Sequence, residues 1–264
     1  MDLKEFDISI ITVNKDNSEG LKRTLASAQK QRVKYREILV VDASNEPEES
    51  YARVLTLGLE RSKFIRQASK GIYPAMNEGL ELASGEWVWF MNAGDEFADD
   101  QSIASVSRVI ARHSSKVYIG GHSVVDNKNN RVVSEINGYA NSKKFAYVLR
   151  QINHQSTIYN RDSLVRIGGY DLRWRLCADY ASVISIANCE KSDSIFFFSN
   201  IISLREPGGV SDSNLIQVQI EKFRIRSEML KGGHLRSLGW LLLHLGHYFR
   251  LKLIRNIQKT IKRI

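Results

Sequence analysis

Short runs of apolar, β-branched residues alternate with stretches of helical spacing along the first part of the chain. The runs "DISIITVN" (7–14), "EILVVDAS" (37–44), "KFIRQA" (63–68) and "EWVWFMN" (86–92) are each typical of a buried strand. Leu21, Leu25 and Ala28 recur at helical spacing, and a second helix is expected at about 73–84, where Gly85 ends it. This alternation predicts an α/β fold with a mixed, mostly parallel sheet flanked by helices.

The second half of the chain has a less regular pattern. The segment "KVYIGGHSVVDNKNNRVVSEI" (116–136) favours a hairpin around the asparagine-rich turn 127–130. A short helix is expected near 142–150, one or two buried strands over 194–206, and a flexible loop over 207–212. We therefore expect an α/β domain over 1–212, followed by a helical, basic amphipathic C-terminal extension over 213–264.

The extension combines an apolar stripe with unopposed positive charge. Apolar residues spaced by three or four predict one helical stripe, made of Leu235, Leu238, Leu241, Leu242, Leu245, Phe249, Leu253 and Ile257. Residues 231–264 hold eight Lys or Arg and no Asp or Glu, out of a net charge of +9 for the chain. Such a helix suits the interface of an anionic membrane; the alternative is packing on the α/β domain or on a second subunit.

Composition favours an intracellular globular protein. With 264 residues, 43% of them hydrophobic, the chain can bury a substantial core. Its two cysteines cannot form a disulfide framework, which favours a reducing cytoplasm. The start "MDLKEFDISII" has acidic residues where a signal peptide is basic, and no apolar run approaches the roughly 20 residues of a membrane-spanning helix. Because most of the charge lies in one segment, we expect no nucleic-acid partner.

Polar residues follow the predicted strands at the points where these end. Asn14, Asp42 and Asn92–Glu96 occupy such positions, and ligands of parallel sheets bind beyond the carboxyl ends of the strands. The chain has no Walker A loop, no Gly-x-Gly-x-x-Gly, no His-Glu-x-x-His and no paired Cys-x-x-Cys. The common NTPase, dehydrogenase, zinc protease and zinc-ribbon classes are therefore excluded.

An ordered set of segments spans roughly residues 7–212: "IITVNKDNSEGLKRTLASAQKQ", "EILVVDAS", "KGIYPAMNEGLELASGEWVWFMNAGDEF", "HQSTIYNR", "GGYDLRWRLCADY" and "GGVS". In that order and spacing, these segments resemble the family 2 glycosyltransferases, particularly the bacterial branch that builds surface polysaccharides. The resemblance implies a glycosyltransferase A-type fold, a catalytic domain over 1–212, a nucleotide-diphosphate sugar donor with UDP favoured, and inversion at the anomeric carbon. It also implies a divalent metal, Mn²⁺ or Mg²⁺.

The segment "NAGDE" stands where the family carries its aspartate-rich metal motif, and Asp95 matches the metal-binding carboxylate. A divalent cation there would neutralise the charge that grows on the departing diphosphate, with phosphates and water as its other ligands. Gly94 departs from the motif, because many relatives carry an aspartate there that helps to hold the ribose. Asn92 and Ala93 are expected to face the nucleotide. The alternative is a plain turn in which Asp95 only satisfies backbone donors.

Other matching positions are assigned to the nucleotide sugar. These are Thr12, Val13, Asn14 and Asp42 at two strand ends, and Lys70, Gly71 and Asn77 around the next helix. One carboxylate and backbone groups can pair with uracil, and glycine lets the backbone approach the nucleotide closely. Asp42 as a turn residue and Asn77 as a structural helix residue remain the alternatives. Ser69 and Pro74 depart from the acidic residues of relatives.

Asp179 in "CADY" matches the family's "ADY" motif, which implies the catalytic base that takes the proton of the acceptor hydroxyl. The alternative role is an N-cap of the following helix, and the two roles are compatible. His154, Arg173, Trp174 and Arg175 are candidates for contact with the acceptor or diphosphate. For each of these four residues, a structural or solvated role stays open.

These observations together predict a metal-dependent hexosyltransferase acting on a saccharide or lipid-linked acceptor of a bacterial surface glycan, such as lipopolysaccharide or capsule. We expect it in the cytoplasm, peripheral on the inner face of the plasma membrane, with homo-oligomerisation through the C-terminal helices as an open alternative. The rival functions are a nucleotidyltransferase and, because of Gly94, a non-catalytic nucleotide-sugar-binding protein. A nucleotidyltransferase would want a glycine-rich, basic loop after the first strand, and "TVNKDNSEG" is a poor version of one.

Overall fold

The computed structural model describes residues 5–47, 49, 61–126, 131–136, 152–190 and 193–230. The expected turn at 127–130, the expected helix near 142–150 and most of the C-terminal extension lie outside these ranges. The chain divides into two units, Met1–Gly209 and Val210–Ile264. In the described residues, no helix is both long and apolar enough to cross a membrane.

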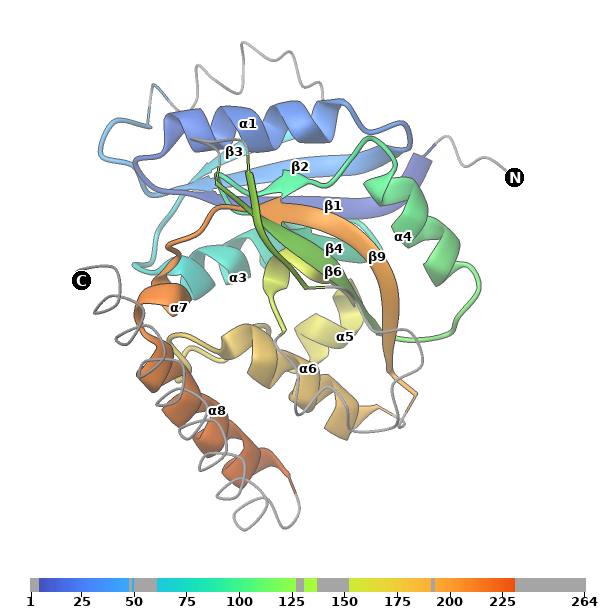
Figure 1. Ribbon diagram of the computed structural model, residues 1–264, viewed down its shortest axis with the longest axis vertical. Helices are drawn as coiled ribbons and strands as arrows, with labels where there is room; N and C mark the ends of the chain where they lie inside the picture. Colours follow the sequence, from blue (N-terminus) through green and yellow to red (C-terminus); the bar gives the residue numbers. More distant parts are fainter. Residues whose placement is uncertain are drawn as a thin grey trace, which may run out of the picture. The chain divides into compact units, whose positions relative to one another are not determined.

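The first unit is built on a nine-stranded sheet with the order β3-β2-β1-β4-β8-β6-β9-β5, in which β7 pairs with β6 (Figure 1). The strands are β1 (Glu5–Asn14), β2 (Lys34–Asp42), β3 (Ser62–Arg66), β4 (Trp87–Phe90), β5 (Glu96–Phe97), β6 (Val117–Asp126), β7 (Arg131–Ile136), β8 (Thr157–Asn160) and β9 (Ile195–Arg205). Strands β3, β2, β1 and β4 are parallel neighbours, while β8 runs antiparallel to β4 and β6. The prediction of a mixed, mostly parallel sheet is therefore confirmed.

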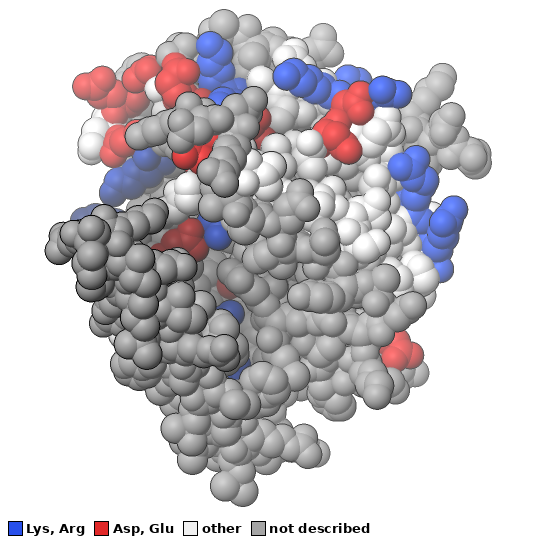
Figure 2. All heavy atoms as spheres, viewed as in Figure 1, with Lys and Arg blue, Asp and Glu red and all other residues white. Residues whose placement is uncertain are grey.

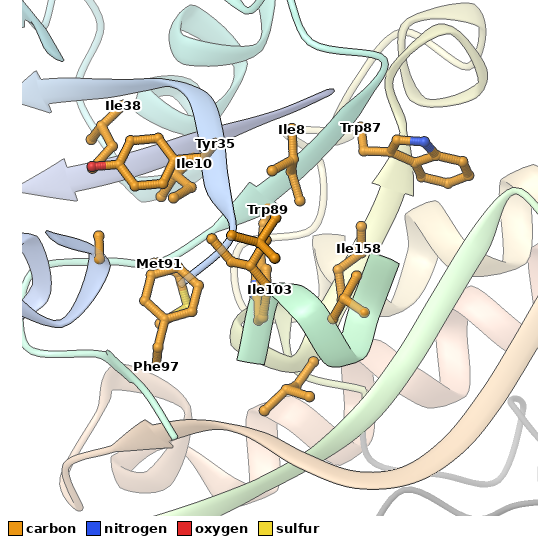
Figure 3. Close-up of a cluster of buried hydrophobic side chains, with 14 of the residues drawn as sticks. Ile8, Ile10, Tyr35, Ile38, Trp87, Trp89, Met91, Phe97, Ile103 and Ile158 are labelled. Carbon is orange, nitrogen blue, oxygen red and sulfur yellow. The ribbon is translucent and has the colours of Figure 1, made fainter. Parts of the chain in front are cut away.

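Helices cover both faces of this sheet (Figure 1). They are α1 (Ser18–Gln29), α3 (Ile72–Leu82), α4 (Ser102–Ile110), α5 (Arg161–Arg166) and α6 (Ala178–Cys189). On the face of α1 and α4, the buried side chains of both helices pack with alternate residues of β1, β2 and β4, including Ile8, Ile10 and Trp89 (Figure 3). Helix α3 contacts β1 and β2, and Figure 1 shows it with α5 and α6 on the other side.

The sequence pattern located most elements to within a few residues, and one detail differs. The apolar stretch 194–206, expected as one or two strands, is the single strand β9, which pairs along its length with β6. The segment 207–212 was expected to be a loop, but helix α7 (Val210–Ser213) begins within it and is followed by α8 (Leu215–Met229). The helices α7 and α8 are the described elements of the second unit.

A buried carboxylate joins the first strands to the end of α3. Glu37 on β2 is 5% exposed, and its Oε1 accepts hydrogen bonds from Ser9 Oγ (2.9 Å), Ser84 N (2.8 Å) and Ser84 Oγ (2.7 Å). Its Oε2 accepts one from Lys63 Nζ at 2.8 Å. Burial by itself would raise the pKa of Glu37, but the bonds from Lys63, Ser84 and Ser9 lower it to about 2.

Figure 2 shows one face of the molecule with the charged side chains of the described residues. Acidic side chains gather at the upper left, and basic side chains lie among them and on the right. Charges of both signs are therefore mixed on the described part of this face, as expected if most of the chain's excess charge belongs to residues 231–264.

Candidate functional site

Three neighbouring parallel strands bring the predicted polar residues to one edge of the sheet. Asn14 at the end of β1 pairs in register with Asp42 at the end of β2. The loop after β4 continues beside β1, because Ala93 N donates a hydrogen bond to Val13 O at 3.0 Å. The carboxyl ends of β1, β2 and β4 therefore form one continuous polar edge, as the strand order requires (Figure 1).

The ends of β1 and β2 are tied together by side-chain hydrogen bonds. Asn14 Nδ2 donates to Asp42 Oδ2 (2.9 Å) and to Ser44 Oγ (3.1 Å), and Ser44 N donates to Asp42 Oδ1 (2.6 Å). Arg66 on β3 lies 3.7 Å from the same carboxylate. Asn14, Asp42 and Thr12 are all buried, and the hydroxyl of Thr12 meets no hydrogen-bond partner among the described residues. The hydrogen bonds of Asp42 therefore hold the ends of β1 and β2 in a fixed arrangement.

The loop before α3 is held by a residue of the helix itself. Glu78 accepts hydrogen bonds from Ala68 N (2.9 Å) and Ser69 N (2.7 Å), so its carboxylate fixes the approach to Lys70. Gly71 follows with a φ of 119°, a conformation that favours glycine, and Lys70 is exposed. Glu78 was not among the predicted site residues, because its partners are backbone groups and leave no sequence signature.

The "NAGDE" loop after β4 folds back on its own carboxylate. Asn92 N donates to Asp95 Oδ2 at 3.0 Å, and Asp95 N donates to Asn92 O at 2.8 Å. Gly94 has a φ of 104°, and its N–H donates to Thr24 Oγ1 on α1 at 3.0 Å. A Cβ at position 94 would meet nothing closer than 3.6 Å, so backbone conformation rather than space selects glycine there.

Next to this loop lies a cluster of charged side chains from other elements. Arg23 on α1 donates to Glu206 Oε1 at 2.6 Å and lies 3.6 Å from Glu96. Burial raises the pKa of Glu96, while the charge of Arg23 opposes that change. The other oxygen of Glu206 lies 4.0 Å from the place where a Cβ of residue 94 would stand. The carboxylate of Glu206, from another part of the chain, therefore borders Gly94.

His154 brings the two principal predicted carboxylates together. It begins the short 3₁₀ turn η2 (His154–Ser156), and its Nε2 lies 3.8 Å from Asp95 Oδ2 while its Nδ1 lies 3.7 Å from Asp179 Oδ2. Asn92 Nδ2 is 2.9 Å from Nε2 of the same ring. Residues at 95, 154 and 179, which are far apart along the chain, thus form one cluster at the polar edge, in which both aspartates are buried.

Two neighbouring carboxylates raise the pKa of this imidazole. Burial lowers the pKa of His154, but hydrogen bonds and charges of Asp179 and Asp95 outweigh it and raise the pKa to about 9. In the described residues, no group of three His, Cys, Asp or Glu side chains has the arrangement of a complete metal site.

Asp179 lies in the first turn of α6, and Cys177 is the residue that caps this helix. The alternative N-cap role for Asp179 is therefore wrong by two positions, since the helix already begins at Ala178. Its Oδ1 accepts from Tyr180 N (2.8 Å) and from Tyr73 Oη (3.3 Å) on α3. Burial, followed by the charge of Asp179, raises the pKa of Tyr73, which keeps its hydroxyl protonated as a donor.

The other predicted residues have their own partners. The amide of Asn77 binds the backbone of Tyr170 at both ends, as donor to O (2.9 Å) and as acceptor from N (2.8 Å). These bonds give Asn77 the structural role that was the alternative to a nucleotide contact. Exposed Arg173 forms a bidentate pair with Asp171 and lies over the ring of Trp174, 5.5 Å from its centre. Trp174 is 2% exposed, so it packs in the core, and Arg175 is exposed.

Comparisons with known proteins agree on the class. The sequence profile "Glycosyl transferase family 2" matches residues 7–167, a span that ends before Asp179. A "PGL/p-HBAD biosynthesis glycosyltransferase" of Mycobacterium tuberculosis is 29% identical over 179 residues, which cover 67% of this chain and 68% of that protein. An "uncharacterized glycosyltransferase" of the same species is 26% identical over 186 residues, 68% of each chain.

Solved structures share the fold at low sequence identity. TarS of S. aureus in complex with UDP superposes with a TM-score of 0.67 and 18% identity, covering 93% of this chain and 72% of that one. The mannosyltransferase PcManGT of Pyrobaculum calidifontis, in complex with GDP-Man and Mn²⁺, gives 0.66 and 17%, covering 89% and 69%. The fold is that of the glycosyltransferase A type. By its matched profile, this chain belongs to glycosyl transferase family 2.

Proposed function

We propose that this glycosyltransferase inverts the anomeric centre as it moves a sugar from a UDP-sugar to a hydroxyl of a lipid-linked or growing bacterial surface glycan. The observation that carries the proposal is the meeting of Asp95 and Asp179 at His154, beyond the carboxyl ends of the parallel strands. One carboxylate is thereby available on the diphosphate side of a bound donor, and the other on the acceptor side.

In the proposed reaction, Asp179 takes the proton of the acceptor hydroxyl while the hydroxyl oxygen attacks the anomeric carbon. The bond between that carbon and the diphosphate oxygen breaks, and the diphosphate leaves with the electron pair. A positioned base of this kind contributes about 10²- to 10⁴-fold to the rate. Tyr73 and the N–H of Tyr180 both bind Oδ1 of Asp179, so they hold the carboxyl plane in place.

The residues near Asp95 fit a divalent cation, Mn²⁺ or Mg²⁺, that is held mainly by the donor. Asp95 supplies carboxylate oxygens, which both cations prefer, and Mg²⁺ is commonly bound through one or two carboxylates together with substrate phosphates. The bound cation would neutralise charge on the departing diphosphate. Gln155 Nε2 donates to Oδ1 of Asp95 at 3.3 Å, which orients the carboxylate for this role. Complexes of the structural neighbours with UDP-GlcNAc and with GDP-Man and Mn²⁺ support a donor and cation of these kinds.

For the nucleotide, we propose contacts along the edge formed by β1, β2 and the loops after β4 and before α3. The assigned residues are Thr12, Val13, Asn14, Asp42, Lys70, Gly71, Asn92, Ala93 and Gly94. Asn14 and Asp42 form the surface on which the nucleobase would lie. Exposed Lys70 supplies a positive charge for the diphosphate. Asn77 has an indirect role, since its amide binds the backbone of Tyr170. We assign no nucleotide contact to Arg173, which pairs with Asp171, or to the buried Trp174.

We also propose that 1–212 is the catalytic domain and that 213–264 is an extension that brings the enzyme to the inner face of the plasma membrane. The support is the charge of residues 231–264, with eight Lys or Arg and no Asp or Glu, beside an apolar stripe. A lipid-linked acceptor of a lipopolysaccharide or capsule is confined to that surface, so membrane contact raises the rate of encounter.

The test is a panel of UDP-GlcNAc, UDP-glucose, UDP-galactose and GDP-mannose with Mn²⁺ or Mg²⁺, read by calorimetry and by release of nucleoside diphosphate. We expect metal-dependent binding and hydrolysis with at least one UDP-sugar. Asp95→Ala should abolish the metal-dependent part of binding while the melting temperature stays near that of the wild type. Wild-type turnover of Asp95→Ala with Mn²⁺ would refute the metal assignment, and binding without any turnover would favour a non-catalytic nucleotide-sugar-binding protein.

A further inference from the structure

The turn that carries His154 is fixed on several sides. The carbonyl of Asn153 accepts from Ser156 N (3.1 Å) and from Thr157 Oγ1 (2.8 Å), which closes the turn. The buried indole of Trp89 on β4 donates to Gln155 O at 2.8 Å. The imidazole therefore projects from a rigid support that belongs to the core rather than to a surface loop.

The two carboxylates that flank the imidazole are supported unequally. Asp95 receives hydrogen bonds on both oxygens, at Oδ2 from Asn92 N and at Oδ1 from Gln155 Nε2. Asp179 receives its two hydrogen bonds on Oδ1, and among the described residues it is His154 that faces Oδ2. Loss of the imidazole would therefore disturb Asp179 more than Asp95.

We propose that His154 is a positioning residue for the transfer reaction, whose ring sets the place of Asp179 relative to Asp95. The inference rests on the proposed function, in which Asp179 is the base and Asp95 lies on the metal side. Each ring nitrogen faces one carboxylate oxygen, at 3.8 Å for Asp95 and 3.7 Å for Asp179, so the ring lies between the two groups. In the proposed function, this spacing sets how far the acceptor hydroxyl lies from the leaving diphosphate. An attacking atom in such reactions must lie about 3–3.5 Å from its target, and small misplacements lower the rate strongly.

This role differs from contact with substrate. Both ring nitrogens are already directed at protein groups within 3.8 Å, and the side chain is only 14% exposed. His154 therefore acts through Asp179, and its removal should lower kcat while leaving the KM for the donor almost unchanged. Partners that orient metal-binding side chains contribute about 10- to 100-fold to activity, and we expect a loss of the same order here.

The experiment measures hydrolysis of the best UDP-sugar of the panel, with Mn²⁺, by the full chain. The variants are His154→Ala, His154→Gln, Asp179→Asn and the double variant His154→Ala with Asp179→Asn. His113→Gln is the matched control, because this exposed histidine stacks on Phe196 away from the cluster, with ring centres 3.8 Å apart. Circular dichroism and melting temperature check the fold of each variant, and calorimetry with UDP and Mn²⁺ checks donor-side binding.

We expect His154→Ala to lose about 10- to 100-fold in kcat, and His154→Gln to retain more because its amide can still donate to Asp179. In the Asp179→Asn background, the substitution at 154 should have little further effect, since interacting residues are not additive. If His154→Ala does not fold, the comparison of His154→Gln with wild type carries the same test.

Two results would overturn the inference and keep the proposed base: unchanged kcat in both His154 variants beside an inactive Asp179→Asn, or full additivity in the double variant. Near-normal hydrolysis by Asp179→Asn would instead show that Asp179 is not the catalytic base. The proposed function and the positioning role of His154 would then both be wrong.

Discussion

Replacing Glu37 by Gln removes a buried charge that joins β1, β2, β3 and the end of α3. The carboxylate accepts four hydrogen bonds, three of them on one oxygen. Its pKa is lowered from 4.5 to about 2, which corresponds to roughly 3 kcal/mol at 1.36 kcal/mol per pKa unit. Lys63 is 62% exposed and its charge is screened by solvent. We therefore expect the Glu37 carboxylate to stabilise the folded state by about 2 kcal/mol at pH 7.

The sign of the pH dependence follows from the direction of the pKa change. A carboxylate with a lowered pKa stabilises the folded state above its ordinary value of 4.5, and this contribution is lost as the pH falls toward 2. Urea unfolding of wild type and Glu37→Gln at pH 7, 5, 4 and 3 should therefore show a difference of about 2 kcal/mol that shrinks below about pH 4.5. Other titrating groups cancel in this difference.

Glu81→Gln on the exposed side of α3 is the matched control, and its free energy of unfolding should stay within about 0.5 kcal/mol of wild type. A Glu37→Gln difference that is absent at pH 7, or that remains constant down to pH 3, would refute the assignment of the lowered pKa to these hydrogen bonds.

Three further predictions concern the site and the extension. Asp179→Asn should keep UDP binding by calorimetry but lose about 10²- to 10⁴-fold in sugar transfer; near-normal transfer would contradict its role as base. Gly94→Ala should lower the free energy of unfolding by about 1–3 kcal/mol in urea, because φ is 104° there; unchanged stability would show that the loop relaxes freely. Truncation after Gly232 should leave donor hydrolysis normal and abolish cosedimentation with anionic liposomes at low salt, and failure of the full chain to bind them would exclude the membrane role.

The sheet could be predicted because its strands are dense in β-branched and aromatic residues and end in recognisable polar groups. Asn14, Asp42 and Asp95 were placed at strand ends by that pattern, and the parallel order then brought them to one edge. The pattern did not reveal Glu37, whose partners lie 26, 28 and 47 positions away in the sequence. Such hydrogen bonds depend on the register between strands, which short-range periodicity does not encode.

The sequence pattern did not reveal the contacts among the site residues either. His154 was a candidate for acceptor or phosphate contact, but its geometry between two carboxylates follows from where η2 and α6 meet the sheet edge. The positive φ at Gly94 likewise explains a departure from the family motif that the sequence showed only as a missing carboxylate. Tyr73 was not identified, because an aromatic residue at helical spacing is indistinguishable from a core residue until its hydroxyl has a partner.

Helix α3 has a consequence for engineering the donor specificity of this enzyme. Within about one and a half turns it carries Tyr73, which binds the proposed base, Asn77, which holds Tyr170, and Glu78, which holds the loop before Lys70. Because one helix carries all three attachments, a shift of the loop before Lys70 would also displace the residues that contact Asp179 and Tyr170. A chimera with a new loop over 67–71 should therefore keep Glu78 and the length of the helix, because the new loop then acquires its anchor without displacing Asp179.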